Sequence, residues 1–127
     1  MTDEPVSPEV FDRLQKATAS NPTELVELYR EYLVEARRTL AEVHAALLRG
    51  NSEELRAGAH YLKGSSQVVG ATVVARYCAA LEEKGRNRDL SATDALLEQT
   101  VTALGSVEAE LEKMLGKAAL PSAGSAA

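Results

Sequence analysis

The sequence has few aromatic residues, a single cysteine and no long apolar run. Aromatics make up 4% of the 127 residues and tryptophan is absent, so a core must be built from Leu, Val and Ala, which suits closely packed helices. One thiol, Cys78, cannot form an internal disulfide, so nothing points to an oxidising compartment. No segment approaches the roughly 20 apolar residues that span a bilayer, and residues 1–7 lack the basic and apolar parts of a signal peptide. We therefore expect a cytoplasmic protein that does not bind a membrane.

The chain also lacks the residues that several chemistries require. Its formal net charge is −5 and it has no basic stripe, which argues against nucleic-acid binding. It has neither a phosphate-cradling Gly-rich loop with its Lys, nor a paired-His zinc motif, nor a cysteine cluster. We expect no bound metal or cofactor and no kinase activity of its own, so another protein must supply any phosphoryl group.

Apolar residues recur at steps of three and four, which is the period of an α-helix. The longest such stripe follows Asn21-Pro22-Thr23-Glu24, which has the pattern of a capping box with Asn21 as cap, and Gly50 ends it. No segment alternates with the period of two that is typical of a strand. The stripe consists of Val26, Tyr29, Leu33, Ala36, Leu40, Val43 and Leu47.

Four further helices are predicted from their start and stop signals. A short one begins at Ser7-Pro8 and ends near Ser20, and the others cover about 52–69, 71–86 and 91–115, the last beginning at Ser91. Short connections favour antiparallel neighbours. The sequence predicts an all-α fold, an up-down-up-down antiparallel four-helix bundle with a short N-terminal helix packed against it. The bundle would occupy 8–116, between a disordered N-terminus, 1–7, and a disordered tail, 117–127.

The two histidines, His44 and His60, lie in different surroundings. His44 follows the apolar stripe of the long helix, and burial under the edge of a neighbouring helix would explain it. The neighbours of His60 one turn away are Arg56, Ala57, Lys63 and Gly64, of which two are small and two are basic. This setting would suit a negatively charged group carried on the imidazole of His60.

Gly64 and Lys63 each allow two interpretations. A glycine within a helix costs about 1 kcal/mol relative to alanine, so something should compensate for that cost. Gly64 either leaves the imidazole open to a partner or lets two helices pack closely. Lys63 is either a solvated surface residue or a cation that stabilises charge on a transferred phosphoryl group.

The run Ala59-His60-Tyr61-Leu62-Lys63-Gly64-Ser65-Ser66 resembles the active-site helix of histidine-containing phosphotransfer (HPt) domains, whose core pattern is His-x-Leu-Lys-Gly. Val69-Gly70-Ala71 continues the likeness, and Leu81-Glu82-Glu83 resembles the following helix. The likeness covers roughly 24–115. It implies a phosphorelay intermediate of two-component signalling, of the bacterial, free-standing and monomeric type.

The resemblance also implies a role for each residue of the motif. His60 would attack the phospho-aspartate of a receiver domain, belonging to a response regulator or a hybrid histidine kinase, through its distal ring nitrogen and pass the phosphoryl group to another receiver. Lys63 would neutralise phosphoryl oxygens, and Gly64 would let the receiver approach. Glu82 would orient the imidazole, where some members have glutamine. The Mg²⁺ for the reaction is expected in the receiver.

The receiver is expected to dock on the surface around His60. Tyr61, Val68 and Ala57 are the apolar candidates, although plain packing at the helix edge would also explain Tyr61 and Val68. Gln67 lies two turns from His60, and Arg56 would attract an acidic receiver face. These five residues form the predicted partner-binding surface.

Two other functions are alternatives to a phosphorelay intermediate. A helical adaptor that binds a partner without phosphotransfer could use the same bundle, because a fold does not fix a function. The phosphoacceptor part of a histidine kinase would need a symmetric two-helix hairpin and an ATP-binding domain, and the sequence shows neither.

Overall fold

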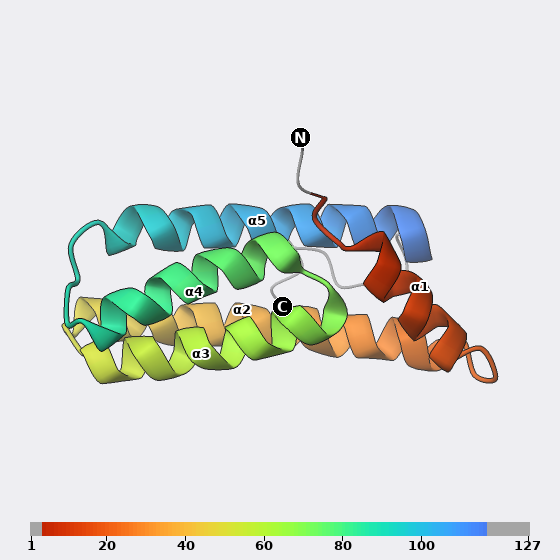
Figure 1. Ribbon diagram of the computed structural model, residues 1–127, viewed down its shortest axis with the longest axis horizontal. Coiled ribbons are helices and arrows are strands. Elements are labelled where there is room, and N and C mark those ends of the chain that lie inside the picture. Colours follow the sequence, from red (N-terminus) through yellow and green to blue (C-terminus); the bar gives the residue numbers. More distant parts are fainter. Residues whose placement is uncertain (1–3, 117–127) are drawn as a thin grey trace.

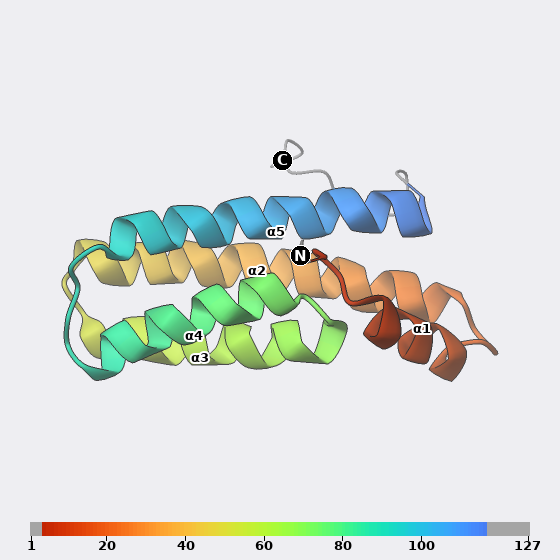
Figure 2. The ribbon, with the colours of Figure 1, turned by 45° about the horizontal axis from the view of Figure 1, so that its top comes forward.

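The computed structural model describes residues 4–116, which form five helices and no strand within that range. Four long helices run alternately in opposite directions, and the short first helix lies across one end of the bundle (Figures 1 and 2). The predicted all-α antiparallel bundle with a short N-terminal helix is confirmed. The predicted tail, 117–127, lies outside the described residues. The helices are α1 (Pro8–Ala17), α2 (Thr23–Leu48), α3 (Ser52–Val69), α4 (Thr72–Arg86) and α5 (Thr93–Leu115).

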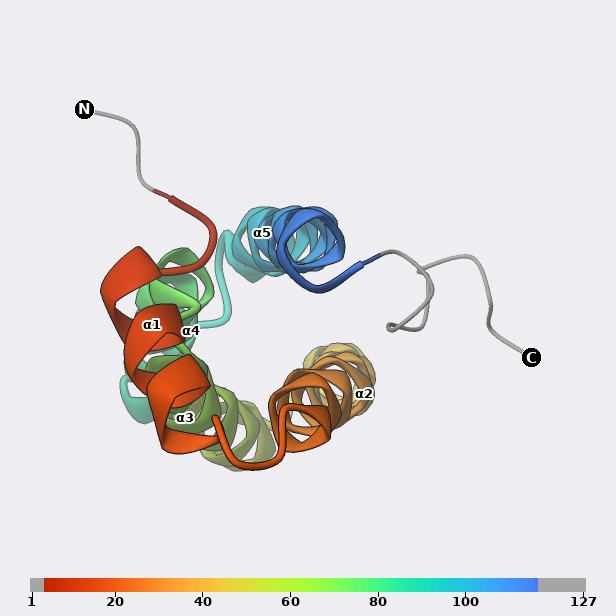
Figure 3. The same cartoon turned by 90° about the vertical axis from the view of Figure 1, so that its right-hand side faces the viewer.

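The core lies along the axis that the four long helices surround (Figure 3). Every long helix contributes fully buried aliphatic side chains to it, as the periodicity of the sequence predicts. Burial of one such side chain stabilises the fold by about 1.5–3 kcal/mol. Among 4–116, no helix is both long and apolar enough to cross a membrane. The largest fully buried aliphatic residues are Leu33, Val43, Leu55, Leu62, Val74, Leu81, Val107 and Leu111.

Two buried tyrosines of α2 hold the second half of α3 in place. The hydroxyl of Tyr29 donates to the carbonyl oxygen of Val69 at 3.0 Å, and the hydroxyl of Tyr32 lies 2.7 Å from the Ser66 hydroxyl. A buried tyrosine needs such a partner for its polar end. Ser66 can be buried on the apolar face of α3 because its hydroxyl is hydrogen-bonded to that of Tyr32.

The starts of α1 and α3 and the end of α3 have caps that are typical of helix termini. The Ser7 hydroxyl accepts from the backbone N–H of Val10 at 3.3 Å, and the Asn51 side chain accepts from the backbone N–H of Glu54 at 3.0 Å. Gly70 ends α3 with φ +84°, a left-handed conformation that favours glycine. Gly70 therefore fixes the turn from α3 to α4.

Two predicted caps and one predicted helix end are wrong. Helix α2 begins at Thr23 without a side-chain cap, since the N–H of Glu24 bonds to the backbone carbonyl of Asn21. Helix α5 begins at Thr93, because the N–H and hydroxyl of Ser91 both bond to Asp89 Oδ1, at 3.1 and 2.5 Å. The first helix ends at Ala17, earlier than the predicted Ser20. At Asn21 and Ser91, hydrogen bonds within a local turn take the place of the predicted side-chain cap.

The segment before α1 is not disordered as predicted, as far as the structure describes it. Val6 is 2% exposed and belongs to the core, and the N–H of Ser7 donates to the carbonyl of Gly70 at 2.8 Å. Phe11 of α1 stacks on Tyr29 of α2, with ring centroids 5.8 Å apart. Val6 thus anchors this mostly polar segment in the core, and the Ser7–Gly70 hydrogen bond ties the start of α1 to the α3–α4 turn.

Helices α3 and α4 share the most extensive contact in the bundle. Gly85 of α4 is buried at this contact, and a Cβ on it would lie 2.8 Å from Arg56 N and from Ser52 O of α3. Gly58 faces the other way, where a Cβ would lie 2.9 Å from Val43 Cγ2 of α2. Both glycines serve close packing of helices.

Candidate functional site

His60 lies on the outer surface of α3, and its side chain is 63% exposed. Its Nδ1 is 2.8 Å from Glu82 Oε2 of α4. This contact joins residues 22 positions apart in the sequence. One ring nitrogen is therefore held by the protein, while the ring itself stays open to the surroundings.

Glu82 is a buried carboxylate that binds three cationic or donor groups at once. Its side chain is 5% exposed, with Oε1 2.6 Å from Lys63 Nζ and Oε2 3.3 Å from an Arg86 guanidinium nitrogen as well as 2.8 Å from His60 Nδ1. The hydrogen bond from Lys63 lowers the pKa of Glu82, with a further lowering by His60, and outweighs the opposite effect of burial. Glu82 is therefore ionised at neutral pH.

An ionised Glu82 decides which tautomer of His60 the site favours. A carboxylate has only acceptor atoms, so Nδ1 must be the donor in this hydrogen bond. In the neutral imidazole, the proton on Nδ1 leaves a lone pair on Nε2. In this neutral tautomer, the geometry presents the lone pair of Nε2 on an exposed ring, which is the form that a nucleophile requires.

The surroundings of Gly64 separate the two interpretations of this residue. Gly64 is exposed, and a Cβ placed on it would have no atom within 4 Å. Close packing of helices therefore does not explain it, in contrast to Gly58 and Gly85. The open space lies one turn from His60 on the same helix face, as access by a partner would require.

Lys63 is also less solvated than a plain surface lysine. Its side chain is 27% exposed, and its ammonium group is bound to Glu82 on the neighbouring helix. It lies one turn from His60 and shares the same carboxylate with it. Lys63 therefore belongs to the site.

The predicted partner-binding residues occupy two sides of His60. Ala57, Tyr61 and Val68 lie on the side of α3 that faces α2, where Tyr61 and Val68 help to line a groove between these helices. Tyr61 is 55% exposed and Val68 is 64% exposed, so helix-edge packing leaves much of both side chains free. Gln67 is exposed as well.

Arg56 lies on the other side, towards α4. Its guanidinium group binds Glu53, one turn earlier on α3, at 2.6 Å. The charge available to a partner is thus reduced by this ion pair.

His44 is not buried as the sequence analysis expected. It is exposed on α2, where it lines a groove towards α5 together with Leu97, Val101 and Gly105. The glycine and the limited contact between α2 and α5 leave this edge open. His44 forms neither a hydrogen bond nor an ion pair with Glu82, whose partners are His60, Lys63 and Arg86.

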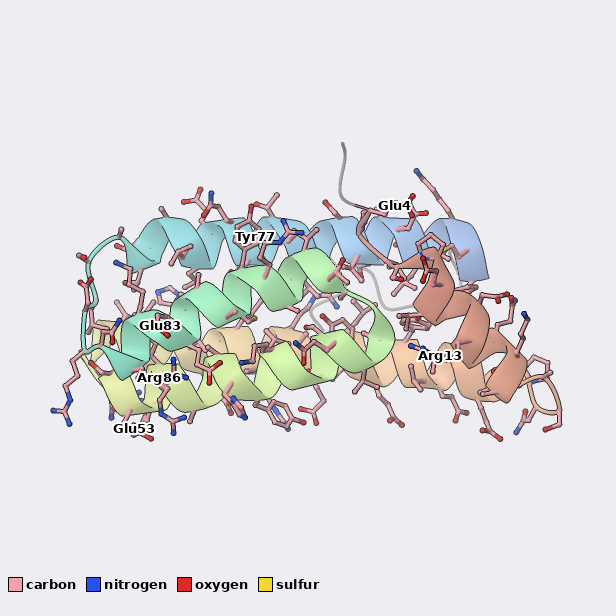
Figure 4. All side chains as sticks on the ribbon, in the orientation of Figure 1. Glu4, Arg13, Glu53, Tyr77, Glu83 and Arg86 are labelled. Carbon is pink, nitrogen blue, oxygen red and sulfur yellow. The ribbon has the colours of Figure 1, made fainter. Side chains whose placement is uncertain are left out.

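Arg86 is the site residue that the sequence analysis did not identify. Its guanidinium group binds Glu82 and also Glu83, and both are on its own helix. Figure 4 labels Arg86 and Glu83 on α4 and Glu53 at the facing end of α3. The spacing of four residues between Glu82 and Arg86 was the available signal. Among 4–116, no group of three or more His, Cys, Asp or Glu side chains could hold a metal ion.

The chain is similar in sequence and in fold to known proteins. Residues 27–119 match the family model of the Hpt domain. No curated protein matches the sequence. The fold is similar to that of histidine-containing phosphotransfer protein B (HptB) from Pseudomonas aeruginosa PAO1, with 29% sequence identity and a TM-score of 0.82, over 89% of this chain and 96% of that chain. Because the family model covers well over half of the sequence, the chain belongs to the histidine-containing phosphotransfer (Hpt) domain family.

Proposed function

We propose that His60 is the phosphorylated residue of this histidine phosphotransfer protein, which acts in a two-component phosphorelay. The observation that carries the proposal is the hydrogen bond between Nδ1 of His60 and Glu82 Oε2 at 2.8 Å. It leaves Nε2 as the nucleophile on a ring that is 63% exposed. His44 has no comparable acceptor among the contacts of the described residues.

The proposed reaction has two transfers. The lone pair of Nε2 attacks the phosphorus of a receiver's phospho-aspartate, the bond between phosphorus and the aspartate oxygen breaks, and the carboxylate leaves with the electron pair. The phosphoramidate on Nε2 then gives the phosphoryl group to the carboxylate of another receiver, and the electron pair of the N–P bond returns to Nε2. The Nδ1 proton can stay on the ring throughout, because Glu82 accepts it as a hydrogen bond in every state.

Lys63 and Gly64 support these transfers in different ways. In the resting protein Lys63 keeps Glu82 ionised, and we propose that its ammonium group also attracts the phosphoryl oxygens when they arrive. Gly64 leaves open the space beside His60, so that the acidic pocket of a receiver can close over the imidazole. The Mg²⁺ of the reaction would come with that receiver.

The proposed docking surface consists of Ala57, Tyr61, Gln67 and Val68, with Arg56 at its edge. The two large apolar members, Tyr61 and Val68, are more than half exposed in the free protein, so a partner that covers them would gain hydrophobic stabilisation. We propose that the partners are receiver domains of response regulators or of a hybrid kinase. We propose further that the chain works as a cytoplasmic monomer.

Replacement of His60 by glutamine tests the proposal. A phosphorylated receiver should label the wild-type protein, and the label should be lost in acid and stable in base, as expected for a phosphoramidate. The His60→Gln variant should take up no label, and His44→Gln should be labelled like the wild type. Labelling that persists in His60→Gln, or disappears in His44→Gln, contradicts the assignment. A partner that binds the wild type without ever labelling it would favour the adaptor function.

A further inference from the structure

Gly85 stands out among the helix glycines because its neighbour is backbone. A Cβ on Gly85 would lie 2.8 Å from Arg56 N, 2.8 Å from Ser52 O and 2.9 Å from Arg56 Cα. At Gly58 the nearest atom is the end of a side chain, Val43 Cγ2 at 2.9 Å. A side chain can rotate away from an added methyl group, but the backbone of a helix cannot. Any side chain at Gly85 must therefore move α4 away from α3.

This backbone contact lies about one helical turn from the catalytic contact. Glu82 precedes Gly85 by three residues on α4, and His60 follows Arg56 by four residues on α3. Because the two helices are antiparallel, both steps lead in the same direction along the pair (Figure 1). The spacing of α3 and α4 at Gly85 is thus the spacing across which Glu82 reaches His60.

We propose that Gly85 is a positioning residue for phosphotransfer: its missing side chain lets α4 approach α3 closely enough for the Glu82 carboxylate to hold Nδ1 of His60. The proposal rests on the proposed role of His60. It adds to that function a residue that touches neither the imidazole nor the phosphoryl group. Gly85 acts through Glu82, and only through the distance between two helices.

The distances decide that a single methyl group is enough to break the contact. The 2.8 Å separation at Gly85 is about 0.6 Å short of the 3.4 Å at which ordinary van der Waals contact begins. A retreat of α4 by that amount would lengthen the His60–Glu82 bond from 2.8 Å to about 3.4 Å. Hydrogen bonds from N–H to oxygen have donor–acceptor distances of about 2.7–3.2 Å. The bond would therefore be lost or severely weakened.

The other contacts of Glu82 would tolerate the same retreat. Arg86 is on α4 and moves together with Glu82. Lys63 is on α3, but its four-carbon chain can follow the carboxylate across the gap. The side chain of His60 is short and its ring is rigid, so it cannot follow the carboxylate. Arg56, another cation on α3, is bound to Glu53. The tautomer of His60 is thus the property most sensitive to the helix spacing.

The test is Gly85→Ala, with the tautomer of His60 read from the ¹⁵N NMR shifts of its imidazole in the unphosphorylated protein. We expect the fraction with the proton on Nδ1 to fall, and the rate of phosphotransfer from a receiver to fall about tenfold. Gly58→Ala, whose methyl group would meet only side-chain atoms, Val43 Cγ2 at 2.9 Å and Thr39 Cγ2 at 3.9 Å, is the matched control for the tautomer. It should leave the His60 spectrum unchanged.

A double-mutant cycle separates positioning from a general loss of structure. In a Glu82→Ala background, Gly85→Ala should cause no further loss of transfer rate. An unchanged His60 tautomer in folded Gly85→Ala, or additive losses in the cycle, would overturn the proposal. The tautomer measurement needs no phosphorylation, so its failure is distinct from a failure of the His60 assignment.

If the Gly85→Ala variant proves unstable, the stabilising substitution Gly105→Ala can be combined with it. Gly105 is exposed on α5 and a Cβ there has no atom within 4 Å, so alanine should stabilise the helix by about 1 kcal/mol without touching the site. If Gly85→Ala stays unfolded in both backgrounds, the proposal is refuted, because Gly85 is then a requirement of the fold and not a positioning residue.

Discussion

Replacing Gly64 by alanine should make the protein more stable, although the residue lies at the proposed functional site. The ideal Cβ position has no atom within 4 Å, so the new methyl group meets no steric resistance and removes no contact. The gain comes from the helix propensity of alanine and amounts to about 0.8–1.0 kcal/mol. For a domain of this size, this corresponds to an increase of about 4 °C in Tm.

Larger side chains at the same position should uncouple stability from function. Gly64→Leu keeps good helix propensity but fills the space through which a receiver would approach His60. We expect a loss of about tenfold or more in the rate of phosphotransfer, since a misplacement of about 1 Å in reacting groups can cost a hundredfold. The folded protein without a partner should remain at least as stable as the wild type.

The assays are urea unfolding followed by circular dichroism and phosphotransfer from a phosphorylated receiver. Gly105→Ala and Gly105→Leu are the matched controls, because Gly105 is also an exposed helix glycine with open space at Cβ. They should match the Gly64 variants in stability and the wild type in transfer rate. A destabilised Gly64→Ala would mean that the space is not open. An unchanged rate in Gly64→Leu would remove Gly64 from partner access.

Three further predictions concern the groups around Glu82. Lys63→Ala should lower the phosphotransfer rate by about 10- to 100-fold without unfolding the bundle by circular dichroism, and an unchanged rate would exclude Lys63 from the mechanism. The pKa of Glu82 is lowered from its ordinary 4.5, chiefly by Lys63, so its contribution to stability is present above that value and is lost as the pH falls through the lower folded pKa. Urea titrations should therefore show a steeper acid loss of stability in the wild type than in Glu82→Gln; identical slopes would contradict the ion pair. Burial raises the pKa of Cys78 to about 12, so a thiol reagent at pH 8 should label it only after unfolding in urea, whereas rapid labelling of the native protein would show that the core is open.

The bundle could be predicted because one physical signal repeats along the chain. In α2, burial follows the apolar stripe from Tyr29 through Leu33 and Ala36 to Val43, and an amphipathic helix has only one way to bury such a stripe. The caps were harder to predict. Ser91 has a hydroxyl that could cap a helix, but this hydroxyl donates to the carboxylate of Asp89, two residues earlier, instead. Competition between neighbouring polar groups depends on backbone conformation, which a residue pattern does not specify.

The site could be predicted only in part, for a similar reason. The motif around His60 is local, so the sequence displays it directly. The contact between His60 and Glu82 depends on how closely α3 and α4 pack. That distance is set at Gly85, which in the sequence is only one residue of the predicted helix 71–86. A glycine pattern cannot distinguish open space, as at Gly64, from a neighbouring backbone.

The exposed position of His60 has a consequence for how this protein must work. Most enzymes enclose the reacting groups in a cleft, but the proposed nucleophile, His60, lies on an exposed helix face beside the open space at Gly64. The bundle cannot by itself exclude solvent water from a bound phosphoryl group or surround the transition state. Each partner must therefore supply the remaining groups of the active site. Discrimination between partners then depends on how well the partner's pocket fits over the imidazole ring. The same exposed helix face would thus enter the pockets of different partners in turn.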